Sequence, residues 1–275
     1  MSEALLDALG QAHTPASGEP RIVSLVPSLT ELLCELGLAD RLVGRTGFCI
    51  HPRDTLRRIP KVGGTKDVKL DAVRALAPTH LVVNIDENRR ETVEALAAFV
   101  PTVIVTHPCV PADNFGLYRL FGGIFDRMKE AATLAQALEA AMAEAAATAA
   151  GLPPEKVLYL IWRQPWMAVS PATYIAAMLA AVGWQTLPAA AGPRYPEIDW
   201  RVPWLGEVQR VLLSSEPYRF GEAHLAEVAA LSGRPALAVD GEYCSWYGSR
   251  AAAGLRYLTR LRRAVAAGQG PQAGG

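Results

Sequence analysis

The chain has 275 residues, of which 51% are hydrophobic and 20% charged, and its 27 basic and 27 acidic side chains give a formal net charge of zero at pH 7. This composition predicts a globular protein of one large domain or two lobes. The balanced charge gives no reason to expect nucleic acid or an anionic membrane surface as a partner.

Strands and helices are expected to alternate along the first 108 residues. The β-branched run at 21–28 is typical of a short buried strand, and 29–44 has the spacing of a helix, with Gly37 near the helix end. The segments 71–85 and 91–108 each repeat the order of a helix, a proline break and a strand. Because parallel strands need crossover connections, this alternation predicts a parallel sheet that helices cover on both faces.

A longer helix is expected at 126–151. This stretch is rich in alanine, lacks proline and internal glycine, and has apolar residues at helical spacing. At 1.5 Å per residue such a helix would be on the order of 35 Å long, which suits a backbone between two lobes. The alternation then resumes, with expected strands at 157–162, 210–215 and 235–240 and expected helices at 171–183, 224–233 and 250–268.

These elements together predict an α/β protein with two lobes. The amino-terminal lobe would comprise 1–125 and the connecting helix 126–151. The carboxyl-terminal lobe would comprise 152–275, with a closing helix and a loose tail at 269–275. A single larger α/β domain is the alternative.

A paired glycine followed by a lysine, in the loop at 62–69, invites comparison with a phosphate-binding loop. A P-loop requires G-x-x-x-x-G-K-[ST], and Gly63, Gly64 and Lys66 do not have that spacing. A G-x-G-x-x-G pattern is also missing. We therefore expect no phosphate site here and interpret the two glycines as a tight turn.

Cysteine usage and the amino-terminal segment bear on location. The four cysteines form no C-x-x-C pair, which argues against a zinc knuckle and fits a reducing compartment. The first 20 residues lack the basic and apolar regions of a secretory leader, and no apolar run of about 18 residues could span a bilayer. We therefore expect the chain as given to be cytoplasmic, or periplasmic if a leader lies upstream of Met1.

Several segments, in the same order, resemble one protein family. The segments are RIVSLVPSLTELLCELG at 21–37, VGGTKDVKLDAVRALAPTHLVV at 62–83, the long helix, and SWYGSR at 245–250. They resemble the substrate-binding proteins of ABC importers that have a helical backbone, above all the cobalamin-binding branch. The resemblance covers nearly the whole chain.

The resemblance implies both a fold and a function. It implies two Rossmann-like lobes with parallel sheets, joined by one long α-helix, with a ligand held in the cleft between the lobes. The ligand would be a corrinoid or another metal chelate, there would be no intrinsic cofactor, and an ABC permease would be a partner. A periplasmic iron-siderophore or haem receptor is one alternative. A cytosolic enzyme that uses the carboxylates of Glu197 and Asp199 is another.

Aromatic residues are candidates for ligand contacts because all six tryptophans lie after residue 160. Trp162, Trp166, Trp246 and Tyr247 follow predicted strands, and aromatic rings on such loops offer rigid apolar area to a large planar ligand. Core packing is the alternative for each of them. For Trp184, in or just after a helix, core packing is the favoured interpretation.

The resemblance adds rim residues to this set. It implies that Phe48, His51 and Thr65 lie on the rim of the first lobe, and Thr65 stands where the cobalamin receptor has a tryptophan. It also implies that Tyr195 matches an aromatic residue that contacts the ligand. The first lobe would therefore offer less stacking surface than that receptor does.

Charged residues near strand ends complete the predicted site. Asp86 and Glu87 would hydrogen-bond to a ligand from the first lobe, and Glu216 would do so from the second. Arg163 and Arg250 are the best candidates to bind a ligand carboxylate or phosphate, because a guanidinium binds such groups in a bidentate manner.

Permease docking and metal binding remain to be assigned. The resemblance implies docking through an acidic residue on each lobe, which Asp71 matches on the first lobe and Glu197 matches, with an uncertain register, on the second. His51 and His107 each lie near a cysteine, but pairs about 55 residues apart are weak evidence for a zinc site. No metal ligand is therefore assigned, and an axial contact from either histidine to a bound metallocycle is the alternative.

Overall fold

Residues 4–189 and 192–268 are described in this computed structural model, so the expected loose tail lies outside the described residues. Contacts divide the chain into two units that are described separately below. Unit 1 comprises Met1–Pro108, Ala112–Gln136 and Tyr247–Ser249, and unit 2 comprises Cys109–Pro111, Ala137–Trp246 and Arg250–Gly275.

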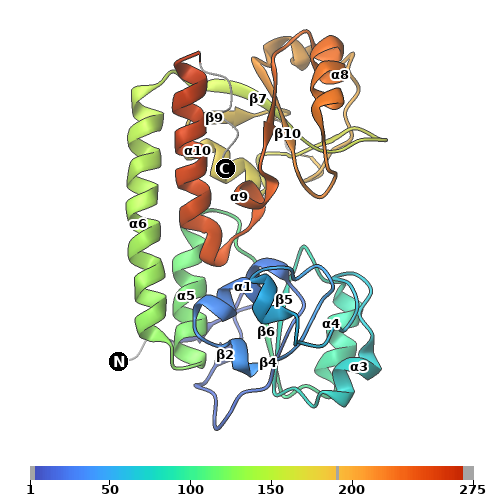
Figure 1. Ribbon diagram of the computed structural model, residues 1–275, viewed down its shortest axis with the longest axis vertical. Helices are drawn as coiled ribbons and strands as arrows, with labels where there is room; N and C mark the ends of the chain where they lie inside the picture. The colour runs from blue at the N-terminus through green and yellow to red at the C-terminus, as the bar shows by residue number, and fades with distance from the viewer. Residues whose placement is uncertain (1–3, 190–191, 269–275) are drawn as a thin grey trace. The chain divides into compact units, whose positions relative to one another are not determined.

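The sheet of unit 1 has four parallel strands, as the sequence predicted (Figure 1). Their order is β4–β3–β5–β6, and the two central strands are buried along their whole length. This burial explains why β3 and β5 are almost entirely apolar in sequence. The strands are β3 (Ile22–Ser24), β4 (Leu42–Arg45), β5 (His80–Asn84) and β6 (Thr102–Thr106).

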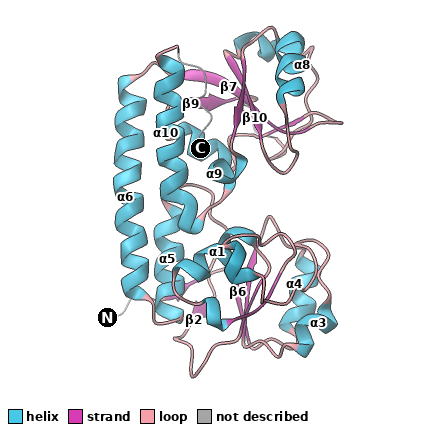
Figure 2. Ribbon diagram, viewed as in Figure 1, coloured by secondary structure: helices cyan, strands magenta, loops and turns pink. Residues whose placement is uncertain are grey.

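Five α-helices of unit 1 connect or cover these strands (Figure 2). The helix expected near 29–37 is α1, which ends at Glu35, close to the expected end at Gly37, whereas strand β4, which begins at Leu42, was not predicted. Gly37 has φ +74°, which a continuing helix cannot accommodate. The helices are α1 (Pro27–Glu35), α2 (Arg53–Leu56), α3 (Leu70–Ala75), α4 (Arg90–Ala97) and α5 (Asp113–Ile124).

An amino-terminal hairpin covers the edge of this sheet. It consists of β1 (Leu5–Leu6) and β2 (Ala12–His13), which pair antiparallel. Ala8 N donates to Val105 O at 2.9 Å, and Val105 N donates to the Asp7 carboxylate at 3.2 Å. Because β6 is the edge strand, these bonds occupy groups that another chain could otherwise pair with.

The long helix α6 runs from Met128 to Gly151, two residues later than the expected start. Asp126, which precedes it, has φ +54° and therefore lies outside the helix. Residues of α6 up to Gln136 group with unit 1, and those from Ala137 onward group with unit 2. Among the described helices none is both long and apolar enough to cross a membrane.

The sheet of unit 2 has five strands, which pair parallel as the sequence predicted except for the short β8. The strand β8 runs antiparallel to the carboxyl half of β7, whereas β9 pairs parallel with the amino half. The order is β11–β10–β7–β8. The strands are β7 (Glu155–Trp162), β8 (Met167–Ala168), β9 (Trp184–Thr186), β10 (Arg210–Ser214) and β11 (Ala236–Val239).

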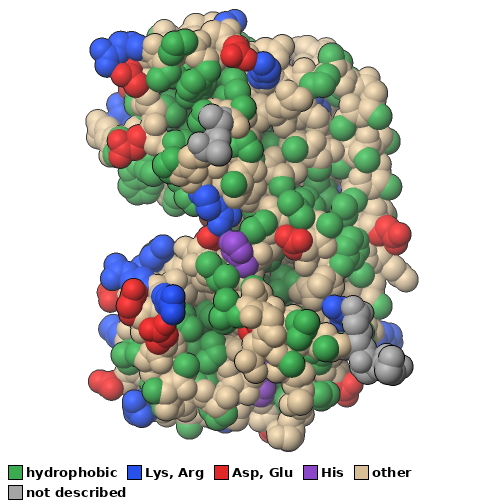
Figure 3. Space-filling view, turned by 180° about the vertical axis from the view of Figure 1, so that it is seen from behind, with side chains coloured by type: hydrophobic (Ala, Val, Ile, Leu, Met, Phe, Trp, Pro, Cys, Tyr) green, Lys and Arg blue, Asp and Glu red, His purple; other side chains and the backbone are tan. Residues whose placement is uncertain are grey.

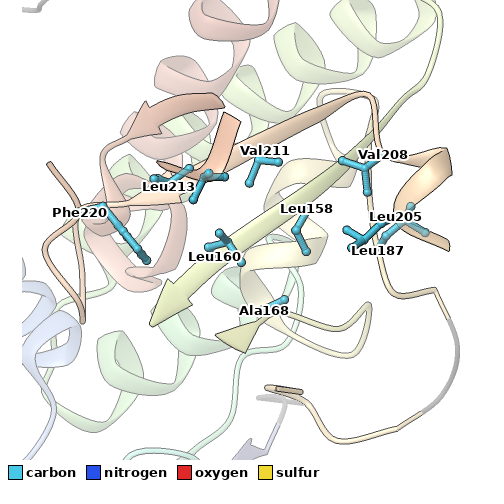
Figure 4. Packing of buried hydrophobic residues seen from close by; sticks show 10 residues of the cluster. Leu158, Leu160, Ala168, Leu187, Leu205, Val208, Val211, Leu213 and Phe220 are labelled. Atoms are coloured by element: carbon cyan, nitrogen blue, oxygen red, sulfur yellow. The ribbon is translucent and has the colours of Figure 1, made fainter. Parts of the chain in front are cut away.

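Helices and an apolar core support this sheet. Leucine and valine side chains of β7 and β10 form one face of the core, and Phe220 packs beside them (Figure 4). Trp184 is completely buried, as the sequence predicted. The α-helices are α7 (Tyr174–Ala180), α8 (Glu222–Ser232), α9 (Gly241–Ser245) and α10 (Ala251–Ala266). Short 3₁₀ helices occur in both units: η1 (Ala39–Arg41) in unit 1, η2 (Pro203–Glu207) in unit 2, and η3 (Gly248–Arg250), which begins in unit 1.

Candidate ligand-binding site

In unit 1, Phe48 and His51 lie after β4, and Asp86 and Glu87 lie after β5, at the carboxyl ends of strands, where α/β sheets bind their ligands. The loop after β4 carries Phe48, whose side chain is 63% exposed, and the half-buried His51. A Cβ atom added to Gly64 would lie 3.2 Å from the Phe48 ring. The 62–69 loop and the aromatic residue after β4 are therefore neighbours.

The paired glycines form a tight turn, which confirms the interpretation made from the sequence. Gly63 has φ +113°, and a Cβ atom there would lie 2.3 Å from the carbonyl oxygen of Asp67. Gly64 N donates to the same oxygen at 2.8 Å. No side chain fits at Gly63, and the turn holds Thr65 next to the strand-end loops.

Two buried asparagines, Asn84 and Asn88, fix the turn after β5, and the sequence analysis did not predict this anchoring role. Asn88 Oδ1 accepts from Asn84 N at 2.9 Å, and Asn88 Nδ2 donates to Thr65 O at 3.0 Å. Asn84 Oδ1 accepts from Asp86 N at 2.8 Å. The 62–69 loop and the turn after β5 are thus joined. The available signal was an asparagine at each end of a polar turn that follows an apolar strand.

The two acidic residues of this turn have defined partners. Asp86 Oδ2 lies 3.4 Å from His107 Nε2, and the main-chain oxygen of Asp86 accepts from Lys66 Nζ at 3.2 Å. Glu87 Oε1 accepts from the Tyr247 hydroxyl at 2.6 Å. Five predicted residues of unit 1 therefore lie in one connected set of loops: Phe48, Thr65, Asp86, Glu87 and Tyr247.

Apolar side chains are exposed on the same loops. Ile50 and Ile85 are about half exposed, and Phe48 is more exposed than either. Ile85 follows β5 directly, and Ile50 follows β4 by five residues. An apolar residue just after a predicted strand was the sequence signal that could have identified both as candidate ligand contacts. Tyr247, by contrast, is only 7% exposed, which corrects the expectation that its ring offers open stacking area. Its burial and the nearby Glu87 charge raise the pKa of its hydroxyl.

In unit 2 the tryptophan at the end of β7 is the accessible one. Trp162 is 40% exposed and meets Tyr218 edge to face, with ring centroids 5.6 Å apart. Trp166 instead stacks on Phe220 and meets Trp200 edge to face, against the core of unit 2. Trp166 is partly buried against this core, so its ring offers less open area than that of Trp162, and its contact with a ligand stays a prediction.

Both arginines predicted to bind a ligand anion already have carboxylate partners. Arg163 forms a bidentate pair with Glu227, at 2.8 and 3.1 Å. Arg250 Nη1 donates to Glu242 at 2.7 Å, and its guanidinium lies over the Trp246 ring at 4.8 Å. A ligand carboxylate would have to compete with these acids.

Glu216 is the carboxylate of unit 2 that lies beside the predicted aromatic residues. Its Oε1 accepts from Ser245 Oγ at 2.7 Å and from Trp246 Nε1 at 2.9 Å. Burial raises the pKa of Glu216, although the bonds from Ser245 and Trp246 act in the opposite direction. Trp246 is only 8% exposed, so the expected open ring face is absent and the indole serves as a donor to Glu216.

The segment at 192–199 runs beside β8. Ala168 N donates to Pro196 O at 2.9 Å, and Tyr195 is 39% exposed, which suits a ligand contact. Glu197 and, in the first turn of α3, Asp71 are exposed, as docking residues must be. Asp199 forms a bidentate pair with Arg201, which lowers the pKa of Asp199 to about 2.

Charges and metal donors in the described ranges show no further concentrated site. On the face shown in Figure 3, basic and acidic side chains are interspersed. Across residues 4–189 and 192–268, no group of three or more His, Cys, Asp or Glu side chains could hold a metal ion. Cys49 is buried, and its sulfur lies 3.1 Å from the hydroxyls of Thr30 and Thr46.

A surface pocket of roughly 190 Å³ lies between the amino-terminal hairpin, the end of β6 and α5. His107, Arg119 and Leu120 are among its lining residues, whereas Phe48, Thr65 and Glu87 are not. This volume is below the range typical of pockets for drug-sized ligands, so a macrocycle would not fit inside it.

Comparison with known proteins places this geometry in a family. A family model described as periplasmic binding protein matches residues 22–204. A vitamin B12-binding protein of Photorhabdus laumondii is 27% identical over 97 residues, which are 35% of each chain. One of Yersinia pestis is 27% identical over 94 residues, which are 34% of this chain and 33% of that protein. These alignments span about a third of the curated relatives.

Solved structures share the fold over nearly the whole chain. The periplasmic vitamin B12 binding protein of Vibrio cholerae has a TM-score of 0.75 at 17% identity, covering 91% of this chain and 98% of that one. A periplasmic heme-binding protein of Roseiflexus sp. RS-1 has a TM-score of 0.75 at 23% identity, covering 90% and 100%. Because the family model also matches more than half of the sequence, the chain belongs to the periplasmic binding protein family, in the class with two α/β units and a long helix.

Proposed function

We propose that this chain is a non-catalytic binding protein for a corrinoid or another metal chelate, related in role to the substrate-binding proteins of ABC importers. The observation that carries the proposal is the set of exposed apolar side chains at strand ends in a member of this family. Relatives named for vitamin B12 and solved structures named for vitamin B12 or heme support the ligand class.

The apolar residues suit a large ring-shaped ligand. Phe48, Ile50 and Ile85 in unit 1, and Trp162 and Tyr195 in unit 2, expose apolar area on loops that ordered strands support. Burying such area is the main source of affinity for a macrocycle, and rigid aromatic rings lose little entropy when they stack. The expectation that the ligand lies in a cleft between two lobes stays a prediction.

Polar contacts are proposed for the remaining residues. His51, Thr65 and Asp86 would contact polar groups of the ligand in unit 1, as would Glu87. Glu216 would do so in unit 2. These groups give the ligand a defined orientation, whereas the apolar residues supply most of the affinity.

The charge arrangement supports a corrinoid over haem as the first candidate. Arg163 and Arg250 are paired with Glu227 and Glu242, so a ligand with carboxylates gains less from them than one whose polar groups are amides. Corrinoid side chains are largely amides, whereas haem carries two propionates. Arg219 is exposed on the loop after β10, which keeps haem as the second candidate.

A ligand titration tests the proposal. We expect tryptophan fluorescence of the purified protein to be quenched on addition of cyanocobalamin or cobinamide, with haem and ferric siderophores as comparisons. The substitution Trp162→Ala should weaken binding about tenfold or more, because an exposed ring contact is lost. Leu231→Ala, at an exposed position on α8, is the control and should bind normally. No binding of any of these compounds to the unsubstituted protein would refute the proposal.

A permease partner is a second part of the proposal. Asp71 and Glu197 are exposed carboxylates, which would meet basic residues of an ABC permease. The substitutions Asp71→Arg and Glu197→Arg should abolish ligand-dependent uptake in cells while ligand affinity stays unchanged, because they reverse charge only at the docking positions. Uptake that survives both changes together would exclude this docking mode. Fractionation of native cells decides between the periplasm, which the family's description suggests, and the cytoplasm.

A further inference from the structure

Three residues from near the carboxyl end of the chain are built into unit 1. Tyr247–Ser249, here called the strap, group with unit 1 by their contacts, although Trp246 before them and Arg250 after them group with unit 2. The strap brings the Tyr247 hydroxyl to Glu87, 160 positions away in the sequence. A contact of such sequence separation costs loop-closure entropy and needs other interactions to hold it.

The strap is held by buried hydrogen bonds to α5. Gly248 N donates to Asn114 Oδ1 at 2.6 Å, and the Tyr118 hydroxyl donates to Gly248 O at 2.8 Å. Asn114 and Tyr118 are almost completely buried. The main-chain N–H and C=O of Gly248 therefore both form hydrogen bonds, and these two bonds fix the position of the strap relative to α5.

Close packing against α1 fixes the strap from another direction. Gly248 has φ +78°, and a Cβ atom there would lie 3.2 Å from Leu32 of α1. A glycine meets both requirements, whereas any other residue would be strained and crowded. The strap therefore holds Tyr247 in one position beside the strand-end loops of unit 1.

Glu87, the partner of Tyr247, lies on a turn that is itself anchored. The turn that carries Glu87 is anchored by the Asn84–Asn88 bond and by the bond from Asn88 to Thr65. The 2.6 Å bond from Tyr247 then fixes the Glu87 carboxylate itself. A short hydrogen bond to a carboxylate is strong. This contact therefore favours the rotamer of Glu87 that places its carboxylate against the Tyr247 hydroxyl.

A part-buried hydrogen bond between a phenol and a carboxylate is by itself a poor way to gain stability. Desolvating a charge costs more than packing two apolar side chains of similar size. A carboxylate held in one orientation does, however, favour recognition of a hydrogen-bond donor, because less entropy is lost when the ligand binds. The arrangement fits a binding residue and its support.

We propose that Tyr247 is a positioning residue, which orients Glu87 so that its carboxylate can accept a hydrogen bond from a donor group of the ligand, such as an amide N–H. This inference rests on the proposed function, since it concerns the same strand-end loops. Tyr247 itself would act through Glu87, in agreement with its buried ring.

A double-mutant cycle in the full chain tests this role. The affinities for cyanocobalamin and cobinamide would be measured for the unsubstituted protein, Tyr247→Phe, Glu87→Gln and the double variant, together with thermal stability. We expect Tyr247→Phe to weaken binding about tenfold, Glu87→Gln at least as much, and the double variant no more than Glu87→Gln alone. Tyr257→Phe is the matched control, because it removes a hydroxyl bonded to Asp240 N within unit 2.

The outcomes separate the inference from the function. Unchanged affinity of Tyr247→Phe with lowered thermal stability would mean a structural strap only and would overturn the inference. Effects of Tyr247→Phe and Glu87→Gln that simply add would also overturn it. If the unsubstituted protein binds neither corrinoid, the proposed function fails in the first measurement and the inference fails with it.

Discussion

Trp184 donates its indole N–H to Glu155 at 2.8 Å, and the same carboxylate accepts from Arg262 at 2.8 Å and from Arg210 at 2.9 Å. This cluster joins the first residue of β7 to β9, β10 and α10. Three donors on one buried carboxylate explain how a charge can lie at the end of the sheet without a large penalty. They also explain why the tryptophan is a core residue.

The first prediction concerns this carboxylate. Glu155→Gln should lower the free energy of unfolding by about 3 kcal/mol, because the buried guanidinium of Arg262 then loses its countercharge. Urea denaturation measures the loss. Glu207→Gln, at an exposed pair with Lys156, is the control and should have a much smaller effect. Equal losses for the two variants would contradict the role assigned to Glu155.

A second prediction concerns the amino-terminal hairpin. Asp7 accepts from Leu9 N and Gln11 N within the hairpin and from Val105 N of β6. Asp7→Ala should therefore release the hairpin, and the Val105 amide should exchange hydrogen much faster.

An aggregation measurement and a control variant complete the test of the hairpin. The uncovered edge of β6 should increase aggregation at high protein concentration. Glu19→Ala, which removes a surface ion pair with Arg41, should leave the exchange of Val105 unchanged. Slow exchange at Val105 in Asp7→Ala would show that the hairpin stays in place without its carboxylate.

A third prediction concerns the glycine turn. Gly63→Ala should destabilise the protein by about 2 kcal/mol or more and weaken ligand binding, because φ is +113° and the new methyl group would meet the Asp67 carbonyl. Gly116→Ala in α5 is the contrast, since nothing lies near an added Cβ there and alanine favours a helix. It should stabilise by up to about 1 kcal/mol. Thermal unfolding compares the stabilities of the two variants. A Gly63→Ala variant as stable as the unsubstituted protein would contradict the requirement for glycine at this turn.

The contrast between these glycines shows what sequence can and cannot reveal. The alternation of strands and helices was predictable because buried parallel strands are apolar and helices carry a periodic stripe. Strand β4 was missed because LVGR was counted with the preceding helical segment, although Gly37 was expected near the helix end. Helix α5 was missed because it contains three glycines, of which Gly122 and Gly123 permit close packing against Ala131 and Leu5.

The places of the candidate residues in the fold were predictable, and their exposure was less so. Predicted strand ends placed Glu87 after β5 and Trp162 at the end of β7, whereas the family resemblance, not a strand end, singled out Phe48, which follows β4. The burial of Trp246 and Tyr247 could not be predicted, because their partners, Glu216 and Glu87, are 30 and 160 positions away. Local pattern does not encode such pairings, which depend on how the chain folds as a whole.

A fourth prediction concerns stability in mild acid. Burial, together with the neighbouring His13, lowers the pKa of His80 below 6.5. The unfolded chain therefore binds a proton at this residue at a higher pH than the folded chain does, so stability is lost as the pH falls below about 6.5. His80→Gln should flatten this part of the stability curve, as measured by urea unfolding from pH 8 to pH 5. An unchanged curve would show that other groups cause the loss.

The last prediction concerns Glu216, whose titration has the opposite sign. Burial raises the pKa of this carboxyl above 4.5, so the folded chain holds its proton to a higher pH than the unfolded chain. Its contribution is therefore present at low pH and is lost as the pH rises through the raised pKa. Glu216→Gln mimics the protonated form and keeps an amide oxygen to accept from Ser245 or Trp246. We expect the variant to gain thermal stability relative to the unsubstituted protein at pH 7.5 and to gain less at pH 4.5. A gain that is the same at both pH values would mean that the buried charge of Glu216 is not its cause.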